Sequence, residues 1–199
     1  GFSQILASRM PQNAMDEDVI VREFNETMQH GSLKEKVSAI QKIDRSTGSI
    51  LFPYLVRHYN DPNWQIRGEF CRTCSFLRYA QAIPYLKILA GDRDWTVRSN
   101  AVRALGKMGE IGEFELLAIL KSEDHYASEA AQVILEHQVF FKENVRRLLS
   151  DDKEQINRGL SFLEDLKNYG NSKLSTQLLN LYQSGNTKEI RLFLGDQFS

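Results

Sequence analysis

Several kinds of residue and segment are scarce in this chain of 199 residues, and each scarcity argues against a class of protein. No run of 18 or more apolar residues occurs, so no segment of the given sequence is predicted to insert into a membrane. Asn-Gly and Asp-Gly pairs, the usual signals of tight β-hairpins, are absent, and there are only four prolines and twelve glycines. The net charge of -1 argues against binding to nucleic acid or membranes through overall charge.

Cysteine is also scarce. Cys71 and Cys74 form a Cys-x-x-Cys sequence without the strand pattern of a redox fold around it, and the second ligand pair of a structural zinc site is lacking. We therefore predict both thiols to be reduced, buried in the core and metal-free. Two reduced thiols favour a cytoplasmic location. The chain begins at Gly1 and not at a methionine, which fits a longer protein with an upstream segment such as a membrane anchor.

The chain does contain an internal repeat with a period of 31 residues. Residues 92–120 align with residues 61–89 in the kind of residue as well as in spacing. The matching pairs are Asp61 with Asp92, Trp64 with Trp95, Ile66 with Val97, Arg67 with Arg98, Cys71 with Val102, Cys74 with Leu105 and Leu89 with Leu120. One more step back matches the apolar residues of 32–60. Self-similarity at a fixed period is the signature of a solenoid.

Apolar residues recur with helical spacing along nearly the whole chain. Ser32 and Glu35 form a capping-box sequence that predicts a helix start. Asp61 and Pro62 are expected to cap and open the next helix, and Gly109 is expected to end a later one. The sequence therefore predicts an all-α fold, an α-solenoid of antiparallel helix pairs.

We expect residues 1–199 to form one domain. Residues 1–31 do not follow the repeat and are interpreted as an N-terminal cap. Residues 32–121 are expected to form the regular repeats. Residues 122–199 keep the rhythm of helices but lose the 31-residue pattern, as degenerate C-terminal repeats would.

The sequence Asp-x-x-Trp-x-Val/Ile-Arg at a helix start, followed by a shorter antiparallel helix, resembles HEAT repeats. It is most similar to the short bacterial HEAT-like repeats that also occur in bilin lyases, since standard units are about 40–47 residues long. The resemblance implies a HEAT/armadillo-like superhelix that serves as a binding scaffold. It also implies a ladder of turn aspartates and helix arginines, here Asp61 with Arg67 and Asp92 with Arg98. The next 31-residue step replaces the arginine by Glu129, so the ladder is expected to end there.

No stretch of the sequence carries a recognisable catalytic pattern. A Gly-rich phosphate loop, a nucleophile elbow and a His-Glu-x-x-His stretch are all absent, and the four histidines are not spaced four residues apart. We therefore expect no catalytic residues, no metal and no cofactor. Trp64 and Trp95 could form a stacking platform, but we interpret them as packing between adjacent repeats.

Charge is distributed unevenly along the chain. Residues 63–110 hold eight basic and four acidic residues, whereas residues 111–152 hold four basic and nine acidic residues. Such blocks commonly form only a solvated face. They also fit a dipolar solenoid that docks a peptide or protein of opposite charge at each end.

The predicted function is a non-enzymatic, monomeric scaffold for protein–protein interaction. Its binding face is expected on the second helices of the first three repeats, because each repeat adds one helix to the concave face of a solenoid. The candidate partner-binding residues are Tyr54, Arg57, His58, Tyr85 and Lys87. Of these, Arg57, His58 and Lys87 are expected to have no packing role inside the protein.

Two alternative functions remain open. A nucleic-acid-binding helical-repeat protein would need a row of lysines and arginines on one concave face, and the sequence does not show one. A lyase-type enzyme that holds a tetrapyrrole rests on the repeats shared with bilin lyases.

Overall fold

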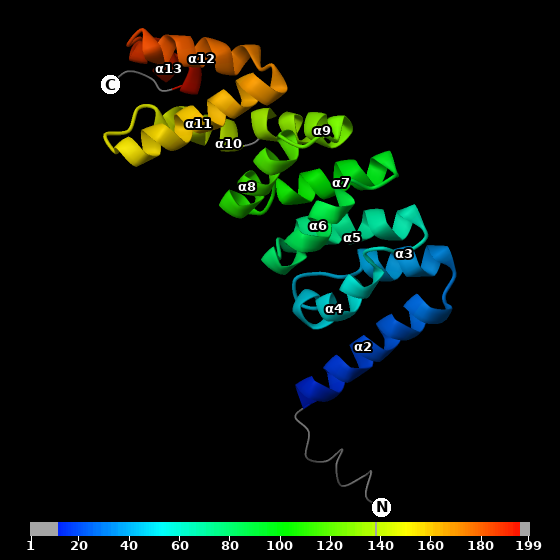
Figure 1. The fold of residues 1–199 in the computed structure, drawn as a ribbon. Helices are drawn as coiled ribbons and strands as arrows, with labels where there is room; N and C mark the ends of the chain where they lie inside the picture. Colours follow the sequence, from blue (N-terminus) through cyan, green and yellow to red (C-terminus); the bar gives the residue numbers. More distant parts are fainter. Residues whose placement is uncertain (1–11, 138, 196–199) are drawn as a thin grey trace, which may run out of the picture.

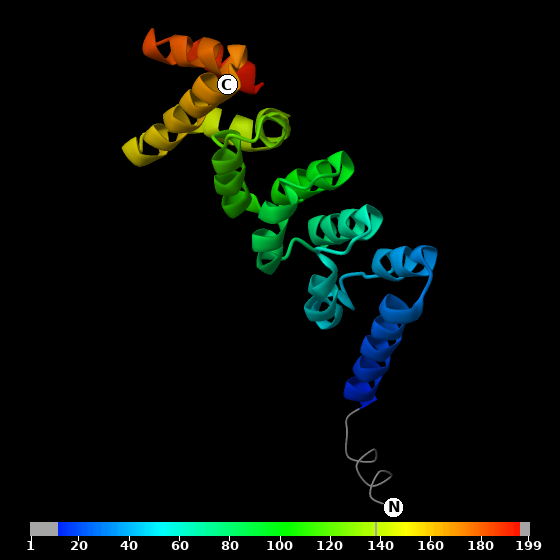
Figure 2. The same cartoon turned by 45° about the vertical axis from the view of Figure 1, so that its right-hand side comes forward.

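The computed structural model describes residues 12–137 and 139–195, and within these residues the chain is helical and has no strand. The predicted N-terminal cap is therefore described only from residue 12. Figure 1 and Figure 2 show the helices stacked in chain order, with α2 and α13 at opposite ends of the stack. The prediction of an all-α solenoid is confirmed.

Helix pairs lie between two flanking helices, which are α2 (Gln12–His30) and α13 (Thr187–Leu194). The first helices of the pairs are α3 (Leu33–Gln41), α5 (Trp64–Leu77), α7 (Trp95–Leu105), α9 (His125–His137) and α11 (Lys153–Gly170). The second helices are α4 (Gly48–Leu55), α6 (Ile83–Leu89), α8 (Gly109–Leu120), α10 (Val139–Arg147) and α12 (Lys173–Gln183). Two short 3₁₀ turns adjoin the second helices, η1 (Val56–His58) after α4 and η2 (Ala80–Ala82) before α6.

Apolar residues at equivalent repeat positions form one continuous core. Ile40, Cys71, Cys74 and Leu105 are fully buried within it. Their burial confirms the 31-residue register, because these are the positions that the repeat alignment assigns to the core. The first helix α5 packs against both α3 and α7. Stability in such a stack comes from each repeat's contacts with its neighbours.

Side-chain caps fix the helix starts. Ser32 and Glu35 form the predicted capping box, in which Ser32 Oγ accepts from the Glu35 amide and the Glu35 carboxylate accepts from the Ser32 amide. The expected start of the next helix is wrong by two residues. Asn63 is the cap, because it has the required extended backbone and its side chain accepts from the Gln65 amide at 2.8 Å. Asp61, with the proline after it, belongs to the preceding turn and accepts from the Asn63 amide.

The turn between α7 and α8 differs from the prediction that Gly109 ends the first helix. The helix α7 ends at Leu105, and Gly109 begins α8 with a φ of 64°. A positive φ is accessible to glycine at little cost. Three residues later, Gly112 allows α8 to pass close to the end of α7, because a Cβ atom there would overlap the Leu105 carbonyl.

The predicted ladder is present, but its partners differ. The Arg67 guanidinium donates from Nε and Nη2 to the Asp92 carboxylate, at 2.8 Å in each case. It also donates from Nη1 to the Asp61 carbonyl oxygen at 2.9 Å. Each arginine therefore pairs with the carboxylate of the next repeat and not with that of its own repeat.

The ladder also continues one step further than predicted. Arg98 Nη1 lies 3.3 Å from Asp124 Oδ1 at the start of α9. The repeat lengthens by one residue here, so Asp124 takes the position that a strict 31-residue step assigns to Glu123. The prediction that the ladder ends before this repeat is wrong.

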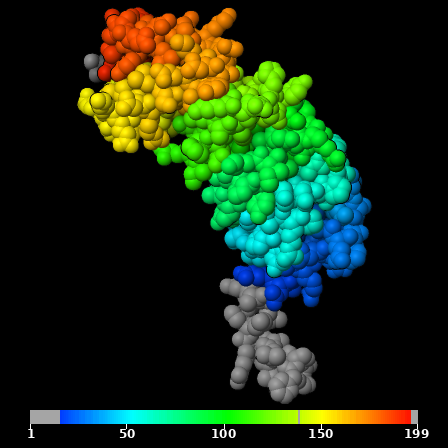
Figure 3. Space-filling model, viewed as in Figure 1, coloured from blue at the N-terminus to red at the C-terminus, as the bar shows by residue number. Residues whose placement is uncertain are grey.

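The stack is curved, as Figure 3 shows in outline. The helices α4, α6 and α8 follow its inner side, and the first helices α3, α5 and α7 follow its outer side (Figure 1). Over residues 12–137 and 139–195, no helix has both the length and the apolar character needed to cross a membrane.

Candidate functional site

Five cationic side chains surround a shallow groove at the carboxyl ends of α5 and α7. The groove has a volume of about 400 Å³. It is lined by Ser75, Phe76 and Asn100 and by the cations Arg45, Arg72, Arg78, Arg103 and Lys107. No carboxylate is among the described residues that line it. We call this set of residues the basic groove.

The repeat and the helix ends explain why these cations gather. Arg72 on α5 and Arg103 on α7 are 31 residues apart, so they occupy the same position in consecutive repeats. Arg78 is the left-handed C-cap of α5, and Lys107 follows the end of α7. Cations near the C-terminus of a helix are stabilised by its partial negative charge. The uneven charge of residues 63–110 thus becomes a local cationic surface.

Phe76 supplies apolar surface within the basic groove. Its side chain is 51% exposed, and the Arg45 guanidinium lies 5.6 Å from its ring centroid. Arg72 pairs with Glu69 at 3.2 Å. No carboxylate in the described part of the chain forms an ion pair with Arg78 or with the groove's other cations. Most of the positive charge in the groove is therefore available to an external anion.

The basic groove adjoins a larger pocket of about 930 Å³ between α8, α10 and the start of α11, and the two share Arg78 and Lys107. The outline in Figure 3 is indented where α11 overhangs α8. The walls of this pocket carry both signs of charge. Its further cations are Arg146, Arg147 and Arg191, and its carboxylates are Glu110, Glu113 and Glu143. We call it the mixed pocket.

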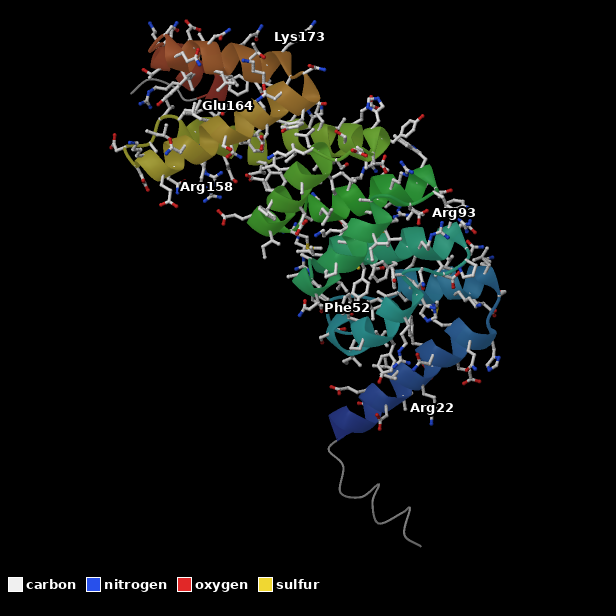
Figure 4. All side chains as sticks on the ribbon, viewed as in Figure 1. Arg22, Phe52, Arg93, Arg158, Glu164 and Lys173 are labelled. Atoms are coloured by element: carbon white, nitrogen blue, oxygen red, sulfur yellow. The ribbon has the colours of Figure 1, made fainter. Side chains whose placement is uncertain are left out.

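A buried polar cluster lies in the wall of the mixed pocket. Asn144 Nδ2 donates to Glu113 Oε1 at 3.2 Å, and Arg147 Nη1 donates to Asn144 Oδ1 at 2.6 Å. Burial raises the pKa of Glu113, although the Asn144 hydrogen bond and the positive charge of Arg147 oppose the rise. Arg158, labelled in Figure 4, lies 3.3 Å from Glu110 and extends these contacts to α11. The cluster therefore joins three helices where the regular repeats meet the C-terminal ones.

The candidate partner-binding residues around α4 have contacts inside the protein. The Arg57 guanidinium lies 5.1 Å from the centroid of the Tyr54 ring. His58 lies edge-on to Phe24 of α2, with ring centroids 6.5 Å apart, and burial lowers its pKa.

The two candidates on α6 also have partners. The ring of Tyr85 lies 4.9 Å from that of Tyr59 and 6.2 Å from that of Phe70, measured between centroids. Lys87 Nζ is 3.1 Å from a Glu115 carboxylate oxygen. The expectation that the charged candidates lack internal contacts is therefore wrong, because neighbouring helices supply partners that the repeat alignment does not show. Their role in partner binding stays a prediction.

Trp64 and Trp95 do not pack between repeats as predicted, since they are 44% and 66% exposed. Each is the first residue of its helix, and helical side chains point back towards the N-terminus. The Arg67–Asp92 pair occupies the junction between the two repeats behind them. The tryptophans are left on the surface as a result.

Cys71 and Cys74 are buried, as predicted, and burial raises the pKa of both thiols. Their reactive thiolate forms are suppressed in consequence. In the part of the chain that the structure describes, no group of three or more histidine, cysteine, aspartate or glutamate residues could hold a metal ion.

Comparison with known proteins places the repeats in a family. Residues 52–136, from within α4 to near the end of α9, match the family model described as HEAT repeats. No curated protein matches the chain. The matched segment contains the arginine–aspartate ladder and the basic-groove residues of α5 and α7, and HEAT repeats typically serve as protein-interaction scaffolds. The chain is a HEAT-like repeat protein.

Proposed function

We propose that the protein is a non-enzymatic scaffold that binds an acidic segment of a protein partner in the basic groove. The observation that carries this proposal is the group of five cations around the exposed ring of Phe76, without a carboxylate among the described lining residues. Opposite charge steers association and fixes register, and arginine and aromatic side chains often dominate binding energy.

An acidic peptide fits this surface better than nucleic acid does. Double-stranded DNA carries about one phosphate charge per 1.7 Å and favours a continuous row of cations. The basic groove instead leads into the mixed pocket, where Glu110, Glu113 and Glu143 would face the phosphates. A short acidic segment needs no more positive surface than the groove offers, and an apolar side chain in that segment would contact Phe76.

A catalytic function has less support. HEAT repeats are generally non-catalytic. Glu113, whose pKa is raised by burial, is held by Asn144 and lies near Arg147. This arrangement is that of a structural polar cluster.

Fluorescence anisotropy with a labelled 12-residue peptide of glutamates and leucines tests the proposal. The peptide is expected to bind saturably, with an affinity that falls as salt rises. The double variant Arg72→Glu/Arg103→Glu is expected to weaken binding by at least about tenfold. The control Arg22→Glu/Lys173→Glu changes the net charge equally at two exposed positions near the ends of the stack (Figure 4) and should bind like the parent protein.

Single-stranded and duplex oligonucleotides of equal charge form the second arm of the experiment. Tighter binding to either oligonucleotide than to the peptide would favour nucleic acid as the ligand. Equal loss of binding in the groove variant and in the control variant would show that only overall charge matters. Both results would contradict the proposal.

A further inference from the structure

Four exposed side chains follow one edge of the stack at intervals of 31 residues. They lie in the first turns of α3, α5, α7 and α9. They are Leu33, Trp64, Trp95 and Tyr126, with exposed fractions of 38%, 44%, 66% and 62%. These helix starts form the right-hand edge of the stack in Figure 1, and Arg93 marks the same edge in Figure 4. We call the four residues the aromatic edge.

Contacts between successive helix starts fix the spacing of the aromatic edge. Arg93 Nη2 donates to the Pro62 carbonyl oxygen at 3.4 Å, which joins the turns before α5 and α7. The Arg98 guanidinium lies 5.8 Å from the centroid of the Tyr126 ring, which joins α7 to α9. Since packed helices lie about 8–10 Å apart, the side chains of the edge recur at about that interval.

A polyproline II helix has a matching repeat. It has three residues per turn and a rise of about 3.1 Å per residue, so every third residue recurs after about 9.3 Å. A β-strand presents one face every two residues, after about 6.6 Å, and a turn of α-helix is about 5.4 Å long. Of these conformations, only polyproline II places one residue on each side chain of the edge.

The hydrogen-bonding groups also match. The indole N–H groups of Trp64 and Trp95 donate to no acceptor in the described part of the chain. A polyproline II segment makes no internal hydrogen bonds, so its carbonyl groups remain free to accept. An indole N–H is a donor only and suits such carbonyl oxygens.

We propose that the aromatic edge is a second binding surface, which binds a proline-rich segment of another protein in the polyproline II conformation. Every third residue of the segment packs on one side chain of the edge. Such segments are largely preformed and lose little conformational freedom on binding. The edge lies at the amino ends of α5 and α7, whereas the basic groove lies at their carboxyl ends. The inference is independent of the proposed function.

Intrinsic fluorescence gives a direct test, because both tryptophans of the sequence lie on the edge. A decaproline peptide is the probe, and a glycine–serine peptide of the same length is the control. Decaproline is expected to shift the emission saturably, whereas the control peptide should not. Trp64→Ala and Trp95→Ala are each expected to weaken binding by at least about tenfold, measured by calorimetry.

Two further variants separate binding from folding. Trp64→Phe keeps an aromatic ring but removes the N–H donor, so it should bind with intermediate affinity. Phe114→Ala removes an equally exposed ring on α8 and should leave decaproline binding unchanged. The absence of saturable binding, or equal binding of the glycine–serine peptide, would overturn the proposal. An emission shift caused only by phosphatidylserine vesicles would also overturn it, since it would identify a membrane-binding surface.

Discussion

Arg67 of α5 and Asp92, in the turn before α7, form a bidentate ion pair between two repeats, and their side chains are only 6% and 9% exposed. Planar guanidinium and carboxylate groups match in this geometry. Because both groups are shielded from water, neither can lose its partner without leaving a buried charge behind. The pair therefore fixes how α5 and α7 stack.

Arg67→Ala is expected to lower the free energy of unfolding by about 3 kcal/mol, since it leaves Asp92 without its partner. Arg72→Ala is the matched control. The Arg72 side chain is 65% exposed, and its loss should cost at most about 1 kcal/mol. Urea unfolding followed by circular dichroism measures both variants. Equal effects of the two substitutions would show that the ladder does not hold the repeats together.

Glu113→Gln is expected to make stability less dependent on pH. Burial raises the pKa of Glu113 above its ordinary value of 4.5, so the folded protein holds this proton more tightly than the unfolded chain does. The resulting stabilisation is present below pH 4.5 and is lost as the pH rises through the higher pKa of the folded state. Glutamine cannot titrate, so the difference in unfolding free energy between parent and variant should change across this window. A constant difference from pH 4 to pH 7 would contradict the raised pKa.

Gly112→Ala is expected to destabilise the protein by about 1–3 kcal/mol or more, because the new methyl group would overlap the Leu105 carbonyl. Gly68→Ala in α5 is the control. A Cβ atom at Gly68 would meet Asn100 at an ordinary contact distance of 3.6 Å. Since alanine favours a helix, this control should stabilise the protein by about 0.5–1 kcal/mol. Thermal unfolding of both variants is the measurement, and destabilisation of similar size in both would refute the close approach of α8 to α7.

The repeat explains why much of the fold could be predicted from the sequence. Its 31-residue period assigns Cys71, Cys74 and Leu105 to the core, and all three are buried. The helix starts were harder to place, because a local motif offers competing caps: Asp61 and Asn63 both have suitable side chains. The backbone conformation of the turn selects Asn63.

The surfaces were less predictable, because they depend on how the repeats are placed against each other. The repeat alignment shows that Arg72 and Arg103 are equivalent, and this spacing is the signal from which the basic groove could have been found. The contribution of Arg45, from the turn between α3 and α4, requires the three-dimensional stack. Likewise, the 31-residue step from Trp95 to Tyr126 indicates the aromatic edge, but only the structure shows that these side chains are exposed.

The inner face formed by the second helices remains a prediction. Charge reversal at Arg57 and Lys87 is expected to weaken binding of a protein partner captured after nuclease treatment, and to change the salt dependence of that binding. Lys87→Glu also places a second carboxylate beside Glu115, so circular dichroism must first show that the variant is folded. Unchanged affinity and salt dependence in both variants would exclude this face from the binding site.

A fluorophore placed inside the basic groove tests the central claim most directly. Ser75 lines the groove, and Ser75→Cys adds one accessible thiol, whereas Cys71 and Cys74 are buried and unreactive. With an environment-sensitive label on Cys at position 75, the acidic 12-residue peptide should change the emission saturably, with the midpoint found by anisotropy. The same label at Tyr169→Cys, an exposed position at the far end of α11, should not respond. A response at position 169 without one at position 75 would contradict binding in the basic groove.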